Sequence, residues 1–302
     1  YGGAIYTDNT TINDSKFLKN YAHESGGAIY GNINISNSQF LENLAYGMSV
    51  DIIEKGGGAI YCTEGEIFNS SFIENAMIYT IGGLDKGGGA IHFEEKGTVQ
   101  SCLFMKNSVQ CRGAAISSKK NPTIINSIFI NNTSPLNDVI SIYSDAPFAG
   151  TNNWFGNNAT NFNETPTQNE NLKCDSWLFL NATASPKVIG QNKTSNIDFK
   201  LYVYDNKTKE VSEYDNALLP ELNLTVNASA GTLEKTVLKL GDSVKINGTK
   251  KGPITVTAAF GYDEVSGEPE SSLINRVIFS QQSIELKVSD PVSKKATKLS
   301  AS

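Results

Sequence analysis

One pair of short motifs occurs five times in the chain. A Gly-Gly-Ala-Ile motif is followed by Phe-x-x-Asn, and the pair returns every 23 to 32 residues, with Ala114 replacing the second glycine in the fifth copy. A fixed pair at such a period predicts a repeat architecture, because each unit can bury its apolar side chains only against its neighbours. The positions we expect to build the scaffold are Gly27, Ile29, Phe40, Asn43, Gly58, Ile60, Phe72, Asn75, Gly89, Ile91, Phe104 and Asn107.

Each repeat predicts one coil of a parallel β-helix. The isoleucine never changes, whereas the next residue is variable, and this contrast is typical of a half-buried strand. That variable column holds Tyr6, Tyr30, Tyr61, His92 and Ser117. The glycine pair suits a corner that needs positive φ or close approach, and the asparagine suits a turn or a bond to the next coil's asparagine. We therefore predict an all-β fold that begins with a right-handed parallel β-helix of about five to seven coils.

Two successive coils are longer than the others at the same corner. The segments Leu44 to Lys55 and Ala76 to Lys86 lengthen the distance from the Phe motif to the next Gly-Ala motif from 11 residues to 19 and 18. Insertions in neighbouring coils should protrude side by side as one ridge, and such insertions often form a binding face. The candidate binding residues are Tyr46, Met48, Asp51, Met77, Tyr79 and Asp85. The alternative, that the two loops only pack on each other, stays open.

The repeat pattern ends before the second half of the chain. Trp154 and Phe155 are suitable to cover the open end of the stack, which exposes core and strand edges. Longer alternating strands with turn signals between them then predict an antiparallel β-sandwich of immunoglobulin type. We expect a β-helix with its cap at 1–182, the sandwich at 183–290, and a linker into a further module at 291–302. Because the chain opens inside a repeat, we expect it to be a fragment of a longer protein.

Composition excludes several functions. The net charge is −6 and the only arginines are Arg112 and Arg276, so nucleic-acid binding is not expected. No apolar run is long enough to span a membrane. Asn-x-Ser/Thr sequons, such as Asn34 and Asn69, fit a glycosylated exported protein and also arise by chance in an asparagine-rich chain.

The sequence contains no group of candidate catalytic residues that is more specific than chance would give. The best cluster is His92 with Glu94, Glu64 and Glu66 on adjacent coils, and a histidine in such a column is more often a surface residue than a catalyst. The cysteines Cys62, Cys102, Cys111 and Cys174 lack the spacing of a zinc site. A bridge between Cys102 and Cys111 and isolated buried thiols are both open. We expect no catalytic residues, no metal and no cofactor.

The motif pair resembles the repeat signature of the chlamydial polymorphic outer-membrane proteins over residues 1–132. The overall layout is similar to the adhesin-like surface proteins of methanogenic archaea, which share the Asn-Asn-Trp-aromatic-Gly turn at 152–156 and later immunoglobulin-like repeats. This resemblance implies an extracellular, cell-surface stalk or adhesin that attaches to other cells, surface glycans or surface proteins. The alternative is a polysaccharide-active β-helix enzyme, either a lyase or a hydrolase.

Overall fold

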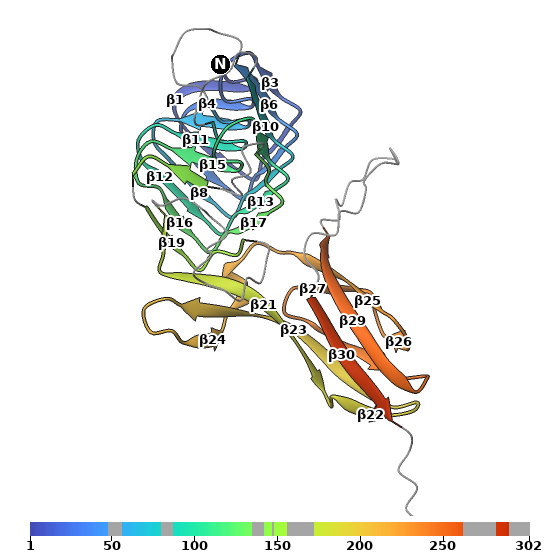
Figure 1. The fold of residues 1–302 in the computed structure, drawn as a ribbon. Coiled ribbons are helices and arrows are strands. Elements are labelled where there is room, and N and C mark those ends of the chain that lie inside the picture. The colour runs from blue at the N-terminus through green and yellow to red at the C-terminus, as the bar shows by residue number, and fades with distance from the viewer. Residues whose placement is uncertain are drawn as a thin grey trace, which may run out of the picture. The chain divides into compact units, whose positions relative to one another are not determined.

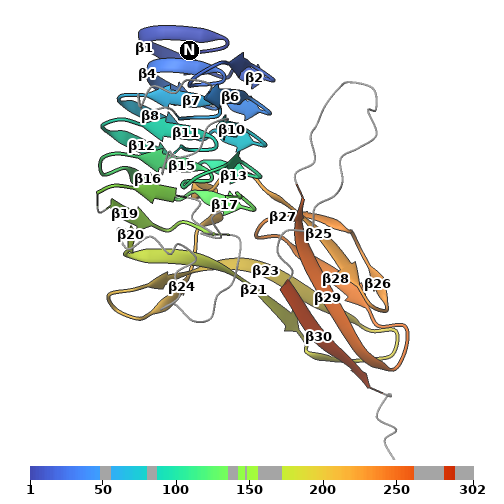
Figure 2. The same ribbon diagram turned by 45° about the horizontal axis from the view of Figure 1, so that its top comes forward.

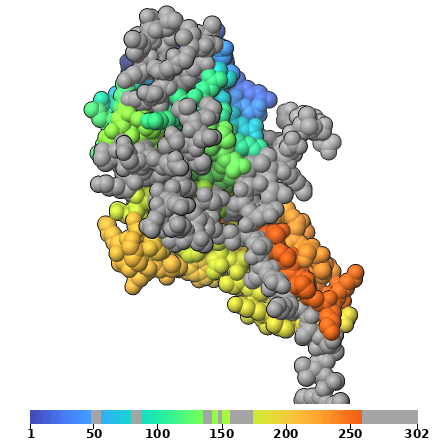
Figure 3. Space-filling view, in the orientation of Figure 1, coloured from blue at the N-terminus to red at the C-terminus, as the bar shows by residue number. Residues whose placement is uncertain are grey.

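The computed structural model describes residues 1–47, 56–79, 87–134, 142–146, 148–155, 172–261 and 282–289. Among these the chain is built of β-strands and carries one short 3₁₀ helix, η1 (Asn216–Leu218). Contacts divide the chain into two units, one of residues 1–179 with 201–220 and the other of 180–200 with 221–302. The strands of the first unit lie in successive coils (Figure 1). In the space-filling view the visible described surface of these coils has colours from blue to green (Figure 3).

Three parallel sheets form the coils of the first unit. The largest contains β1 (Ile5–Asn13), β4 (Ile29–Ser36), β7 (Ile60–Cys62), β8 (Gly65–Phe68), β11 (Ile91–Phe93), β12 (Gly97–Gln100), β15 (Ile116–Ser118), β16 (Thr123–Ile125), β18 (Ile142–Ser144), β19 (Phe148–Thr151) and β20 (Leu172–Cys174). The second contains β2 (Lys16–Leu18), β5 (Gln39–Leu41), β9 (Ser71–Ile73), β13 (Leu103–Met105) and β17 (Ile128–Ile130). The third contains β3 (Tyr21–Ala22), β6 (Leu44–Gly47), β10 (Ala76–Tyr79) and β14 (Ser108–Val109).

The register between neighbouring strands is one whole coil. Ile29 pairs with Ile60 and Ile91 with Ile116, while Phe72 pairs with Phe40 in the second sheet. Figure 2 shows β1, β4, β7, β11 and β15 lying one above another. The predicted coils and their parallel stacking, which are those of a β-helix, are confirmed, while the handedness stays a prediction.

The phenylalanines of the repeats form one column in the core. Ring centroids are 4.7 Å apart between Phe17 and Phe40, 4.8 Å between Phe40 and Phe72, and 4.9 Å between Phe72 and Phe104. These rings lie within 5° of parallel, and their spacing equals the distance between hydrogen-bonded strands. Phe155 extends the column beyond Phe129, so the turn that was expected to act as a cap also continues the core.

The asparagines of the repeats form a second, buried column. The Oδ1 atom of Asn75 accepts hydrogen bonds from the backbone nitrogen (3.0 Å) and Nδ2 (2.9 Å) of Asn43. Its Nδ2 donates to the carbonyl of Phe40 and to Oδ1 of Asn107, both at 2.9 Å. The bond between asparagines of neighbouring coils, expected from the sequence, is thus present and closes the turn after each Phe motif.

The two glycines of each corner serve different purposes. The first has positive φ, as in Gly57 at 69°, where a Cβ atom would lie 1.8 Å from the carbonyl oxygen of Ile60. The second has no such dihedral but lies against the next coil, since a Cβ on Gly58 would lie 2.0 Å from the carbonyl oxygen of Gly89. Both reasons expected from the sequence, positive φ and close approach, therefore apply.

Two further sheets, mainly antiparallel, contain the strands of the second unit together with β24 and the ends of β21 and β23, which belong to the first unit. One holds β21 (Ser176–Ser185), β23 (Thr194–Asp205), β24 (Val211–Glu213), β26 (Thr232–Leu233) and β28 (Ser243–Asn247). The other holds β22 (Val188–Gly190), β25 (Asn223–Ala228), β27 (Val237–Lys239), β29 (Gly252–Gly261) and β30 (Gln282–Ser289). Both sheets bury alternate side chains, including Phe199, Ile246, Leu224 and Val256. The antiparallel pairing is as expected, and the immunoglobulin topology stays a prediction.

Residues 201–220 pack with the coils, although they lie within the range 183–290 that was expected to form the second domain. The hydroxyl of Tyr214 donates to Oδ1 of Asn126 at 2.8 Å, and that of Ser101 donates to the carbonyl of Leu218 at 2.7 Å. Tyr214 is buried by these contacts. Long-range contacts of this kind leave no pattern in the local sequence, so periodicity did not reveal them.

Candidate functional site

The first four residues of each insertion are strand rather than protruding loop. Strands β6 and β10 pair in parallel, with Ala45 opposite Met77 and Tyr46 opposite Ile78. The ridge therefore begins as an ordered part of the third sheet. Met48, Asp51 and Asp85 lie outside the described residues, and of Tyr79 only the backbone is described.

Met77 does not belong to a contact surface. Its side chain is fully buried in a small apolar cluster with Ala45, Val109 and Cys111. Because alternate residues of a strand face opposite sides, Met77 points to the inside of the coil, and its assignment as a binding residue is corrected. Tyr46, one residue further along than Ala45, is half-buried and keeps part of its ring on the surface.

The column after the repeated isoleucines changes from open to closed along the stack. Tyr6 is 67% exposed, whereas Tyr61 is 8% and His92 only 2% exposed. The rings stack, with centroids 4.8 Å apart between Tyr30 and Tyr61 and 5.1 Å between Tyr61 and His92. The expectation that His92 is a surface residue is wrong, since Gly56 packs over its ring.

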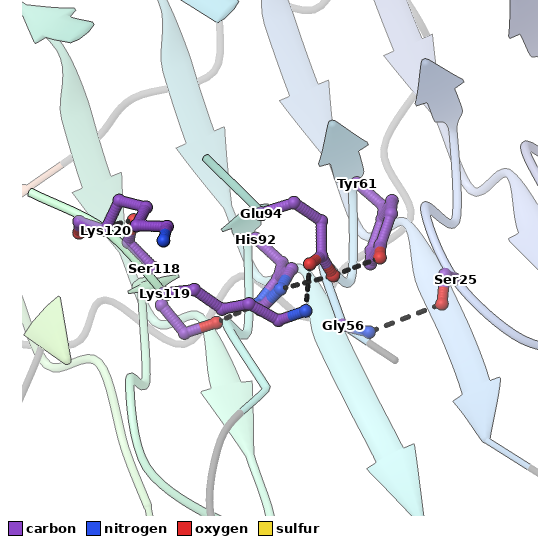
Figure 4. Close-up of polar contacts among 9 residues, drawn as sticks. Ser25, Gly56, Tyr61, His92, Glu94, Ser118, Lys119 and Lys120 are labelled. Carbon is purple, nitrogen blue, oxygen red and sulfur yellow. Dashed lines mark hydrogen bonds and ion pairs between the residues drawn. The ribbon is translucent and has the colours of Figure 1, made fainter. Parts of the chain in front are cut away.

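His92 lies at the centre of a polar network (Figure 4). Its Nδ1 is 2.6 Å from Oγ of Ser117, and its Nε2 is 3.2 Å from Oε1 of Glu94. Glu94 also accepts a hydrogen bond from the hydroxyl of Tyr61 and pairs with the ammonium of Lys119. Of the acidic residues grouped with His92 from the sequence, Glu94 is the partner, and Glu64 and Glu66 line a hollow elsewhere on the largest sheet.

Burial dominates the electrostatics of this network. It raises the pKa of Tyr61, and the hydrogen bond to Glu94 raises that pKa further. It also lowers the pKa of Lys119. Both shifts favour uncharged partners around Glu94, as expected where few water molecules solvate a charge.

The arrangement of Ser117, His92 and Glu94 contains the residue types of a nucleophilic triad. A nucleophile, however, must reach a substrate, and Ser117 is fully buried while His92 is nearly so. The network therefore satisfies polar side chains that the stacking brings together. Ser117 and Lys119 were not assigned as partners from the sequence. The register pairs His92 with Ser117 and Phe93 with Ser118, so aligning the coils residue by residue could have revealed both.

The four cysteines are free and buried. A bridge between Cys102 and Cys111 is absent, so the alternative of isolated buried thiols holds. The thiol of Cys102 donates to the carbonyl of Gln100 at 3.2 Å, and burial raises its pKa to about 12. Within the described part of the chain, no group of three or more His, Cys, Asp or Glu residues could hold a metal ion.

The coils and columns define the first unit as a β-helical repeat structure. Residues 14–32 and 37–63 match the model of the Chlamydia polymorphic membrane protein repeat. No curated protein and no solved structure gives a significant match. The match supports the first part of the resemblance seen in the motifs, and the likeness to archaeal adhesins stays a hypothesis. Over the described ranges we find no helix with the length and apolar character needed to cross a membrane.

Proposed function

We propose that this chain is part of a cell-surface adhesin or stalk that attaches to other cells, surface glycans or surface proteins without catalysing a reaction. The observation that carries the proposal is the stacked coil scaffold together with its match to a repeat of Chlamydia polymorphic membrane proteins. The matched family is named for membrane proteins, which supports a location at the cell surface.

The scaffold suits a role in contact more than one in chemistry. The residues that repeat are turned inward: Ile60, Phe72 and Asn75 are fully buried. Such residues hold the coils together, so any recognition must come from the positions that vary between coils. The ridge around Tyr46 is one such place, because β6 and β10 present their paired strands there from two successive coils.

The enzymatic alternative rests on His92 and its partners. It would require substrate to reach Ser117, which is fully buried and bonded to the histidine ring. We therefore propose that the chain is not an enzyme. The direct test is incubation with pectin, alginate and host glycans while released reducing ends are measured. We expect no product, and turnover that disappears in His92→Ala would refute the proposal.

The adhesive role is tested with the ridge. Replacing Tyr46 and Tyr79 together by Ala should weaken attachment of the chain to whole cells, because aromatic side chains supply much of the contact energy at protein surfaces. Tyr21→Ala is a matched control, since this exposed tyrosine lies in the third sheet on another coil. Unchanged attachment of the double variant would exclude the ridge as the contact site.

A further inference from the structure

A hollow of about 310 Å³ opens on the outer face of the largest sheet. Residues from four successive coils line it, beginning with Asn9 on β1. The polar side chains around it are those of Asn32, Asn34, Glu64, Glu66, Lys96 and Thr98. Gly65 and Ile33, which pair with each other, also line it through positions that face the core, since a Cβ on Gly65 would lie 3.3 Å from Sγ of the buried Cys62. Four coils at the spacing of paired strands give the hollow a length of about 14 Å along the stack.

We propose that this hollow binds an uncharged glycan chain, which runs along the stack across the coils. The inference rests on the proposed adhesive function and gives it a site and a ligand class. Amide, carboxylate and hydroxyl groups accept and donate the hydrogen bonds that sugar hydroxyls require. A hollow that spans four coils fits a chain of sugar units better than one compact molecule.

The polar groups of the hollow are available to a ligand. Asn34, Glu64 and Glu66 are exposed, and none of their side chains has a hydrogen bond or ion pair within the described residues. Lys96 lines the same space as both glutamates but pairs with neither at ion-pair distance. One side chain is engaged, since Oδ1 of Asn32 accepts from the backbone nitrogen of Glu64 at 3.0 Å and so fixes the turn at the wall.

The lining argues against other ligand classes. An extended peptide would need free backbone groups, but β8 is paired with β4 on one side and β12 on the other. Two carboxylates against one ammonium disfavour an acidic glycan. A metal cation is disfavoured as well. It would need both glutamates as ligands, and the ammonium of Lys96 in the same hollow would repel it.

The tyrosine column ends two residues before the hollow on β4. Tyr30 is followed by Gly31, whose φ of 137° bends the strand, and then by Asn32, which lines the hollow. Tyr30 is half-buried between Tyr6 and Tyr61, with centroid distances of 5.3 Å and 4.8 Å. An aromatic ring beside a polar groove offers the C–H groups of a sugar an apolar surface next to its hydroxyl partners.

The test uses the full chain and two oligosaccharide probes. Lacto-N-neotetraose is neutral, and its sialylated form differs by one acidic sugar. We expect calorimetry to detect binding of the neutral probe and weaker or no binding of the sialylated one. The double variant Asn34→Ala, Glu66→Ala should raise the Kd about tenfold or more, because it removes hydrogen-bonding groups from exposed positions.

A matched pair of threonines provides the control. Thr98 lines the hollow and pairs in register with the exposed Thr123, which lies one coil further and outside it. Thr98→Ala should weaken binding while Thr123→Ala should not, with unchanged circular dichroism in both.

Absence of neutral-probe binding, equal binding of both probes, or wild-type affinity of the double variant would overturn the inference. If the chain still attached to whole cells after any of these results, the proposed adhesive function would be retained. If only the ridge variant then lost attachment, the contact site would be the ridge.

Discussion

The buried asparagine column provides the sharpest test of how the coils are held together. Replacing Asn75 by Ala removes four side-chain hydrogen bonds, two accepted from Asn43 and one donated to each of Phe40 and Asn107. At about 1 kcal/mol for each neutral bond, the loss is about 4 kcal/mol of unfolding free energy. Such a loss is large for a single substitution, because the abandoned partners stay buried.

The matched control is Asn20→Ala in the same column. Asn20 lies in the first coil, and its side chain donates one hydrogen bond, to Oδ1 of Asn43 at 2.8 Å. Its backbone nitrogen keeps its own bond to the same oxygen at 3.0 Å. The expected cost is therefore about 1 kcal/mol, or a quarter of that at Asn75.

Two measurements compare the variants. Urea denaturation should show a lower midpoint for the coil transition in Asn75→Ala than in Asn20→Ala. Native-state hydrogen exchange should show faster exchange of the Asn43 amide only when Asn75 is replaced, because that amide then has no acceptor. Equal midpoints, or an Asn43 amide that stays protected, would refute the view that the column stabilises the stack through these bonds.

Two further predictions concern the core and the thiols. Phe72→Ala should cost about 3 to 5 kcal/mol, because it opens a cavity between Phe40 and Phe104, and a urea midpoint equal to wild type would contradict this. Burial raises the pKa of Cys102 and Cys174 from 9.0 to about 12, so the unfolded chain loses these protons first as pH rises. Stability should be full below pH 9 and fall from there toward 12. Urea midpoints at pH 7 and 10.5 test this, and equal values would argue against it.

The scaffold could be read from the sequence because the same residues return at the same place in every coil. Ile60 and Phe72 had to point inward, since a single coil cannot bury them alone. The third sheet was not predicted from the sequence. Its strands β6 and β10 begin inside the two insertions and were therefore assigned to them. Met77 was misplaced for that reason.

The candidate sites were less predictable, because exposure depends on what neighbouring coils and segments cover. His92 occupies an outward position yet is nearly buried, since Gly56 and Ser117 close over it. The hollow around Glu66 has no sequence motif. It arises because residues from four separate coils come together there.

The one-coil register determines how far the stack can extend. Each coil uses 23 to 32 residues, yet it adds only about 4.8 Å to the stack, whereas an extended chain covers about 3.3 Å with every residue. The stack is therefore short for its number of residues but stiff, and its length changes by one whole coil at a time. Because Asn43, Asn75 and Asn107 are equivalent, a coil removed or added between them leaves every column continuous. A protein built this way can lengthen or shorten the distance over which it makes contact without redesigning its core.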